Sequence, residues 1–123
     1  MKKILFIEDE AALQKTFGDI LGIEGFRVIP AIDGEIGLRL AYSEQPDLII
    51  LDLVLPRLHG LEVLRGLKEK KETCDIPVII LTNLGDLENI EKALQLGATT
   101  YMVKSDHTLN DIVEKVKKQF LIN

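Results

Sequence analysis

The sequence has little cysteine and no long apolar run. Its 123 residues include a single cysteine, Cys74, so no internal disulfide can form, which fits a reducing cytosol. No apolar run exceeds about half a dozen residues, far short of the ~20 that span a bilayer. The first of these runs is also too short for a secretory signal. We therefore expect a cytoplasmic protein that does not cross a membrane.

The sequence also lacks an excess of positive charge. Its formal net charge is −5, and no basic block is long enough to offset it. This charge balance argues against general affinity for nucleic acid or for an anionic membrane. The two histidines, His59 and His107, stand alone, so each is expected in a surface loop and not in a Cys/His metal cluster.

What the chain does contain is a regular alternation of two hydrophobic patterns. Short continuous apolar runs, typical of buried strands, occur at 4–7, 48–51, 78–81 and 101–103, with a less uniform run at 26–32. Pro30 lies in that last run and cannot donate to a ladder, so it favours an edge strand. The length fits one domain over residues 1–123.

Between the strands, apolar residues recur at helical spacing. Gly97 stands where a helix C-terminal glycine belongs, and Thr108 with Asp111 resembles a capping box. The stripes that share a helical face are Leu13, Phe17, Ile20 and Leu21; Ile36, Leu40 and Ala41; Leu61, Leu64 and Leu67; Leu87, Ile90 and Leu94; and Leu109, Ile112, Val113, Val116 and Phe120.

This pattern predicts an α/β fold in which five strands alternate with five helices. Strands that are apolar on both faces are typical of a parallel sheet covered on both sides. Right-handed crossovers then give a doubly wound, flavodoxin-like three-layer sandwich, with strand order 2-1-3-4-5.

Polar residues follow four of the apolar runs. Glu8 and Asp9 follow the first run, and Asp52, Thr82 and Lys104 follow three later ones. The carboxyl ends of parallel strands lie on one edge, where open α/β sheets bind ligands. We therefore expect the three carboxylates to converge there, with Thr82 and Lys104 on neighbouring strands.

The chemistry of such a group follows from its charges. Three close carboxylates repel one another, and Mg²⁺ removes the repulsion, with the backbone carbonyl of Val54 a further candidate ligand. An aspartate can accept a phosphoryl group as an acyl phosphate, while a lysine neutralises charge on the transferring oxygens. No residue is an obvious general base for water. Each residue alone also has an ordinary interpretation, as a helix cap, a strand residue or a solvated lysine, so the inference depends on their combination.

The chain resembles the receiver domains of two-component response regulators. The resemblance rests on FIEDE (6–10), LDLVLPRLHG (51–60), LTN (81–83) and YMVKS (101–105). It implies that Asp52 accepts a phosphoryl group from a histidine kinase or a histidine phosphotransfer protein, with Thr82 and Lys104 contacting that group. It also implies Mg²⁺ held by Asp9, Asp52 and the Val54 carbonyl, with Glu8 acting through water. Tyr101 matches the aromatic switch position, which works together with Thr82.

Three departures from the family pattern lead to predictions of their own. Glu8 replaces a common aspartate, which leaves metal binding plausible. Ser105 replaces the proline that supports a cis peptide, so we expect either a trans Lys104–Ser105 bond or a strained cis bond in an unusual loop at 104–108. Val54 and Leu84 flank the site and are apolar, so neither can orient an attacking water, which predicts a long-lived phosphoryl group.

The resemblance implies a signalling protein, not an enzyme, with at most slow autophosphatase activity. A stand-alone receiver is favoured over a fragment of a longer regulator with an output domain. The surface at about 85–120 would bind a downstream protein target or a second copy, without direct nucleic-acid or membrane contact. A pseudo-receiver remains an alternative. Two rival classes are disfavoured. An aspartyl-phosphate phosphohydrolase requires an acidic residue two positions after its nucleophile, where this chain has Val54. A dinucleotide-binding domain requires a glycine-rich turn after the first strand, where this chain has EDEAA.

Overall fold

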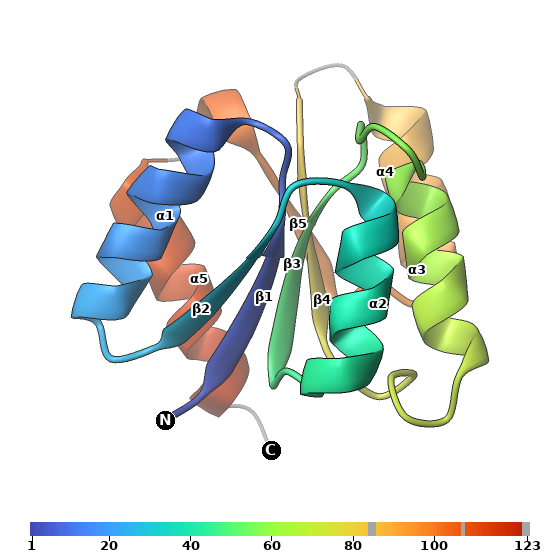
Figure 1. The fold of residues 1–123 in the computed structure, drawn as a ribbon. Helices are drawn as coiled ribbons and strands as arrows, with labels where there is room; N and C mark the ends of the chain where they lie inside the picture. Colours follow the sequence, from blue (N-terminus) through green and yellow to red (C-terminus); the bar gives the residue numbers. More distant parts are fainter. Residues whose placement is uncertain (84–85, 107, 122–123) are drawn as a thin grey trace.

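Strands and helices alternate along the whole chain (Figure 1). The structure is a computed structural model, and it describes residues 1–83, 86–106 and 108–121. The strands are β1 (Lys3–Ile7), β2 (Arg27–Ala31), β3 (Leu48–Asp52), β4 (Val78–Thr82) and β5 (Thr100–Val103). The helices are α1 (Ala11–Ile23), α2 (Gly34–Glu44), α3 (Gly60–Glu69), α4 (Leu87–Gln95) and α5 (Leu109–Leu121), with a short 3₁₀ turn over Lys104–Asp106.

The five strands form one parallel sheet in the order β2-β1-β3-β4-β5, which confirms the predicted doubly wound fold. Pro30 lies in β2, an edge strand, as its missing N–H requires. The register pairs Asp52 with Leu81 and Thr82 with Val103, so the carboxyl ends of the central strands reach the same edge.

Two cores lie on opposite faces of the sheet because successive strand residues point to opposite sides. On β1, Ile4 and Phe6 join the core beneath α1 and α5, whereas Leu5 and Ile7 join the core beneath α2, α3 and α4. Figure 1 shows the same arrangement, with α1 and α5 on one side of the sheet and the other three helices opposite. The inner strands β1, β3 and β4 are buried on both faces, as their continuous apolar runs indicate, whereas the edge strands β2 and β5 are partly exposed.

The stripe predicted for α4 lies on one face of the helix, but only part of that face is buried. Ile90 and Ala93 are buried, but Leu87 is 66% and Leu94 is 41% exposed. At about 100° per residue, Leu87 and Leu94 point within about 20° of each other, and their mean direction lies about 80° from that of the buried pair. The periodicity identified the helix correctly, but two of its leucines lie on an exposed flank.

The predicted helix ends are confirmed. Thr108 N donates to Asp111 Oδ2 at 2.9 Å, and Asp111 N donates back to Thr108 Oγ1 at 3.2 Å, which is a capping box. Gly97 has a φ of 111°, and Ala98 N donates to the Ala93 carbonyl in a Schellman motif that ends α4.

The loop between β3 and α3 closes tightly on the end of β3. Gly60 N donates to the Leu53 carbonyl at 2.8 Å, and a Cβ on Gly60 would lie 2.5 Å from Leu53 Cα. Only glycine therefore fits where α3 begins. His59 lies in the loop before α3, as expected, but it is half-buried and caps the helix, because its Nδ1 accepts from Leu61 N at 3.1 Å. His107 lies outside the described residues.

The Lys104–Ser105 bond is trans, so the first of the two predicted alternatives holds. The backbone after β5 turns at once into the 3₁₀ segment Lys104–Asp106, an arrangement that the serine permits. This turn begins at Lys104, whose side chain reaches back to the edge of the sheet.

Candidate functional site

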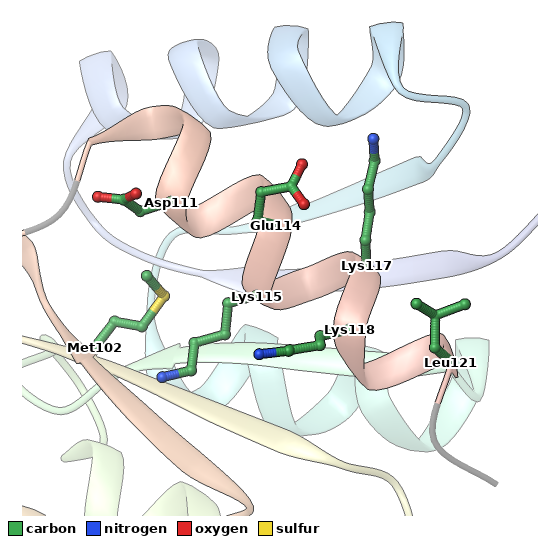
Figure 2. Close-up of a pocket in the computed structure, with 7 residues that line it drawn as sticks. All are labelled: Met102, Asp111, Glu114, Lys115, Lys117, Lys118 and Leu121. Carbon is green, nitrogen blue, oxygen red and sulfur yellow. The ribbon is translucent and has the colours of Figure 1, made fainter.

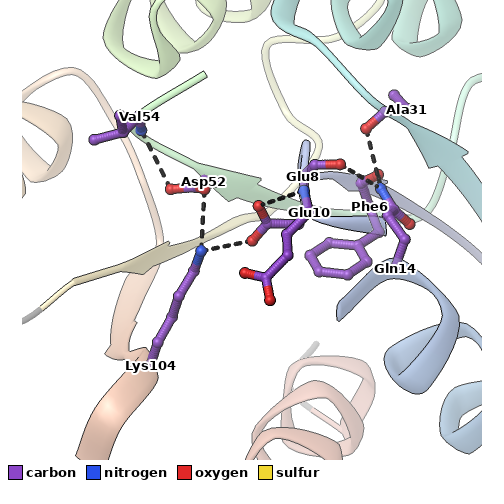
Figure 3. A network of polar contacts seen from close by, with 8 residues as sticks. All are labelled: Phe6, Glu8, Glu10, Gln14, Ala31, Asp52, Val54 and Lys104. Atoms are coloured by element: carbon purple, nitrogen blue, oxygen red, sulfur yellow. Dashed lines mark hydrogen bonds and ion pairs between the residues drawn. The ribbon is translucent and has the colours of Figure 1, made fainter. Parts of the chain in front are cut away.

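Three carboxylates gather at the carboxyl edge of the central strands (Figure 3 shows Glu8 and Asp52). Asp52 ends β3 and Glu8 follows β1, and both are nearly fully buried, whereas Asp9 is exposed. Each residue offers one oxygen, and these oxygens all lie within 4.8 Å of one another. Among the described residues, this is the one group of metal-ligating side chains that the fold assembles. The structure therefore brings Glu8, Asp9 and Asp52 together, as the sequence predicts.

The Lys104 ammonium bridges the two buried carboxylates. Its Nζ lies 2.6 Å from Glu8 Oε1 and 3.1 Å from Asp52 Oδ2 (Figure 3). Burial acts to lower the pKa of Lys104, but the hydrogen bonds and negative charges of Glu8 and Asp52 outweigh burial and hold it above its ordinary value. Lys104 is therefore a fixed cation at this edge of the sheet.

Glu8 is the most perturbed acid of the site. Burial raises its pKa to about 7, opposed by the hydrogen bond from Lys104 and assisted by the negative charge of Asp52. Its Oε1 has a close partner in the Lys104 ammonium at 2.6 Å. A nearby positive charge favours the ionised form of a buried carboxylate, and a metal cation at this edge would act in the same direction.

Backbone donors orient the remaining carboxylate oxygens. Val54 N donates to Asp52 Oδ1 at 3.2 Å, and Glu10 N donates to Glu8 Oε2 at 3.3 Å. The Val54 side chain itself is 57% exposed, so it offers an apolar surface, with no polar group, beside Asp52. Leu84, the second predicted apolar neighbour, lies outside the described residues.

Thr82 reaches the same edge but does not contact Asp52 through a hydrogen bond. Its side chain is fully buried, and its hydroxyl donates to Asp86 Oδ2 at 3.3 Å. Asn89 Nδ2 donates to the other carboxylate oxygen of Asp86, Oδ1, at 2.7 Å. The hydroxyl is thus directed toward the start of α4 in this structure.

Tyr101 lies on β5 with its side chain outward, at 38% exposure. Its backbone carbonyl accepts from Lys115 Nζ at 3.1 Å. The Tyr101 side chain therefore lies at the surface of the edge strand β5 and is not part of the acidic group.

Sequence reasoning missed two polar residues that support the site. Asp86 holds the Thr82 hydroxyl, and Gln14 of α1 donates to backbone carbonyls at the ends of β1 and β2. The signal for Gln14 was a neutral polar residue next to the buried stripe of Leu13 and Phe17. The signal for Asp86 was a capping-type residue just before a helix.

The assembled groups define what this edge can do. An all-oxygen carboxylate set is the donor set that Mg²⁺ prefers, and the lysine supplies a second positive charge. A carboxylate oxygen can attack phosphorus directly to form an acyl phosphate, and Asp52 supplies such an oxygen. The edge therefore combines carboxylate oxygens with a cation, which are the groups that phosphoryl transfer to a carboxylate requires.

Comparison with known proteins identifies the family to which the chain belongs. The family model described as the response regulator receiver domain matches residues 4–117. Sporulation initiation phosphotransferase F of Bacillus subtilis is 32% identical over 117 residues, covering 95% of this chain and 92% of the relative. The chain therefore belongs to the response regulator receiver family, whose members are phosphoacceptors in two-component signalling.

Longer relatives and solved structures match as well. The DNA-binding dual master transcriptional regulator RpaA of Synechocystis sp. is 39% identical over 104 residues, which cover 85% of this chain and 43% of the regulator. A response regulator receiver domain protein from Clostridium thermocellum superposes with a TM-score of 0.85 at 32% identity, with both chains fully covered. The chain spans about two-fifths of the length of the first curated relatives that it matches.

Membership of the family sets general expectations for this chain. Receiver domains generally use Mg²⁺ at an acidic pocket, and they interact with histidine kinases or phosphotransfer proteins and with downstream targets. The acidic group here fits the first property. Over the described residues, none of the helices combines the length and apolar character of a membrane span.

Proposed function

We propose that Asp52 is the phosphoacceptor of this receiver domain. The observation that carries the proposal is the position of Lys104 Nζ between Asp52 Oδ2 and Glu8 Oε1 at the edge of the sheet. A buried carboxylate with a fixed cation beside it has both an attacking oxygen and a partner for the phosphoryl oxygens.

The proposed reaction transfers one phosphoryl group. An Asp52 carboxylate oxygen forms a bond to phosphorus, while the bond from phosphorus to a kinase or phosphotransfer-protein histidine nitrogen breaks. The electron pair of that bond leaves with the imidazole. Lys104 then exchanges part of its contact with Asp52 for a phosphoryl oxygen, which keeps the added charge paired.

Glu8, Asp9, Asp52 and the backbone carbonyl of Val54 would hold Mg²⁺, with Glu8 acting through water. The cation supplies charge neutralisation for the phosphoryl oxygens when it is bound. The support for this ligand set is the convergence of the three carboxylate oxygens within 4.8 Å of one another.

Thr82 and Tyr101 are proposed to carry the switch. The Thr82 hydroxyl would leave Asp86 for a phosphoryl oxygen, because a charged acceptor competes well with its present 3.3 Å hydrogen bond. Tyr101 would then turn inward from its half-exposed position. The physical basis is a two-state element biased by a local change of charge.

The output surface is proposed to be formed by α4, β5 and α5. Leu87 and Leu94 expose apolar side chains on α4, and Tyr101 is exposed on β5. Figure 2 shows the α5 side of this region, where Lys115 and Lys118 extend from the helix toward the β5 side of a groove of about 510 Å³. A downstream protein target, or a second copy of the chain, would bind here. We expect no direct contact with nucleic acid. We expect the protein to be cytoplasmic.

We further propose that the phosphoryl group is long-lived. Val54 exposes only methyl groups beside Asp52, so it cannot orient a water for hydrolysis. The protein would act as a phosphoacceptor with at most slow autophosphatase activity. A phosphoryl lifetime of seconds at neutral pH would contradict this.

Intact-mass spectrometry tests the assignment. The wild type, incubated with Mg²⁺ and a small acyl phosphate such as acetyl phosphate, should gain one phosphoryl group. Asp52→Asn should gain none, and excess EDTA should prevent the gain in the wild type. No gain in the wild type, or an equal gain in Asp52→Asn, would overturn the proposal.

A further inference from the structure

The side chain of Gln14 forms hydrogen bonds beside the acidic group. It lies in the first turn of α1, directly after the turn that carries Glu8 and Asp9. Its Nε2 lies 2.8 Å from the Phe6 carbonyl, 3.1 Å from the Glu8 carbonyl and 3.0 Å from the Ala31 carbonyl (Figure 3 shows this side chain and its acceptors). One amide thus ties together the end of β1, the acidic turn and the end of β2.

The orientation of the Gln14 amide follows from its neighbours. All three nearby groups are carbonyl oxygens, so only the NH₂ end can face them, and its two hydrogens are shared among three acceptors. The Oε1 atom is left buried without a hydrogen-bond partner. An unsatisfied buried oxygen is unfavourable, and arrangements of this kind persist where function requires them.

The carbonyl of Glu8 belongs to the peptide group that joins Glu8 to Asp9. Glu8 N already donates to the Ala31 carbonyl at 2.9 Å, so Gln14 fixes the second polar group of Glu8. The Asp9 side chain, by contrast, is exposed and has no hydrogen bond or ion pair with any described residue. The direction of the Asp9 carboxylate therefore depends on how firmly this peptide group is held.

We propose that Gln14 is a positioning residue for the cation site, acting through the Glu8–Asp9 peptide group. It contacts neither the cation nor the phosphoryl group, and it pre-organises Asp9 by fixing the backbone from which that side chain extends. The inference rests on the proposed function, because it assumes that Asp9 is a Mg²⁺ ligand.

The test measures Mg²⁺ affinity directly. Gln14→Met keeps the length of the side chain but removes the donor. Gln119→Met on α5 is the matched control, since Gln119 is also partly buried within a helix and its side chain has no hydrogen bond to any described residue. Calorimetric titration with MgCl₂ should give a dissociation constant about tenfold higher for Gln14→Met, and unchanged for the control.

Two further measurements separate positioning from a structural role. At saturating Mg²⁺, Gln14→Met should accept phosphoryl groups from acetyl phosphate at the wild-type rate, with only the half-saturating Mg²⁺ concentration raised. In an Asp9→Asn background, Gln14→Met should cause little additional loss of affinity, because both changes act on the same ligand. A lower urea midpoint with unchanged Mg²⁺ affinity would show a structural role alone and overturn the inference.

The experiment also distinguishes this inference from the proposed function. Wild-type protein that binds Mg²⁺ and accepts a phosphoryl group, together with an unaffected Gln14→Met variant, would overturn only the role of Gln14. Wild-type protein that binds no Mg²⁺ would overturn both. Normal phosphorylation of Asp52→Asn, with weakened Mg²⁺ binding in Gln14→Met, would overturn the phosphoacceptor assignment alone.

Discussion

Two partly buried lysines lie at opposite edges of the sheet, and their surroundings differ. Lys104, at the carboxyl edge, contacts the carboxylates of Glu8 and Asp52. Lys68, in the last turn of α3, donates to the backbone carbonyls of Cys74 at 3.0 Å and Ile76 at 3.5 Å. The first lysine has charged partners, and the second has neutral ones.

The pKa values of the two lysines respond in opposite directions. Burial lowers the pKa of Lys68, and the nearby Cys74 and Asp75 oppose this only in part. Burial acts on Lys104 as well, but Glu8 and Asp52 hold its pKa above the ordinary value. At one end of the strands, Lys68 ties a loop to a helix end, whereas at the other end Lys104 stays charged beside two buried carboxylates.

The largest expected effect is on the chemistry at Lys104. Lys104→Met should slow phosphorylation of Asp52 by acetyl phosphate by roughly 10²-fold, because the transferring oxygens lose a fixed cation. The same variant should bind Mg²⁺ more tightly, since the carboxylates lose a competing positive charge. Intact-mass time courses and calorimetry measure the two effects. If Lys104→Met were phosphorylated at the wild-type rate, Lys104 would have no role in phosphoryl transfer and would not differ from Lys68 in this respect.

The next effect is a dependence of Mg²⁺ binding on pH. Burial raises the pKa of Glu8 from 4.5 to about 7, so the folded protein binds a proton between these values that the unfolded chain has lost. This bound proton contributes up to roughly 3 kcal/mol to the free energy of unfolding. The contribution is fully present below pH 4.5 and is lost as the pH rises through about 7. Urea unfolding of the Mg²⁺-free protein should show this loss.

Mg²⁺ binding should have the opposite dependence, because a cation must displace the Glu8 proton. Its dissociation constant should rise about tenfold for each pH unit below the pKa. Glu8→Gln serves as the control and should remove most of this dependence. A flat pH profile in the wild type would contradict the assignment of Glu8 to the cation site.

A smaller effect is expected at the opposite edge. Lys68→Met should lower the free energy of unfolding by about 1–2 kcal/mol, since two backbone carbonyls lose their donor. Its phosphorylation rate should stay close to that of the wild type. Urea unfolding and the same mass assay give both values, and slow phosphorylation in this variant would show that the two edges are coupled.

The smallest expected effect concerns the cap of α3. His59 Nδ1 accepts from Leu61 N, so His59→Asp should retain the cap and add a favourable charge at the helix N-terminus. We expect a gain of about 0.5 kcal/mol in the free energy of unfolding, and a loss of similar size for His59→Ala. Urea unfolding at neutral pH measures both, and equal stability of the two variants would argue against a capping role.

Much of the fold could be predicted because its rules are local. Continuous apolar runs indicate strands buried on both faces, and Pro30 identifies an edge strand. The approach of Glu8, Asp9 and Asp52 followed from the shared edge of parallel strands. Ser105 pointed to an unusual turn, but the sequence could not decide between trans and cis.

The rest depends on tertiary contacts that periodicity does not encode. Leu87 and Leu94 have the spacing of a buried stripe, but the side of α4 that is buried carries Ile90 and Ala93, so the two leucines are exposed. The hydrogen bond from Thr82 to Asp86 depends on where the loop after β4 brings the start of α4. The triple contact of Gln14 requires the ends of two strands, β1 and β2, to meet beneath one side chain.

Chemical mapping of the phosphoryl group tests the central claim most directly. Borohydride reduction of the phosphorylated protein converts an aspartyl phosphate to homoserine, which peptide mass spectrometry locates. The account predicts that this conversion occurs at Asp52, depends on Mg²⁺, and is strongly reduced in Lys104→Met but not in Lys68→Met. Conversion at another carboxylate, with Asp52 unmodified, would contradict it.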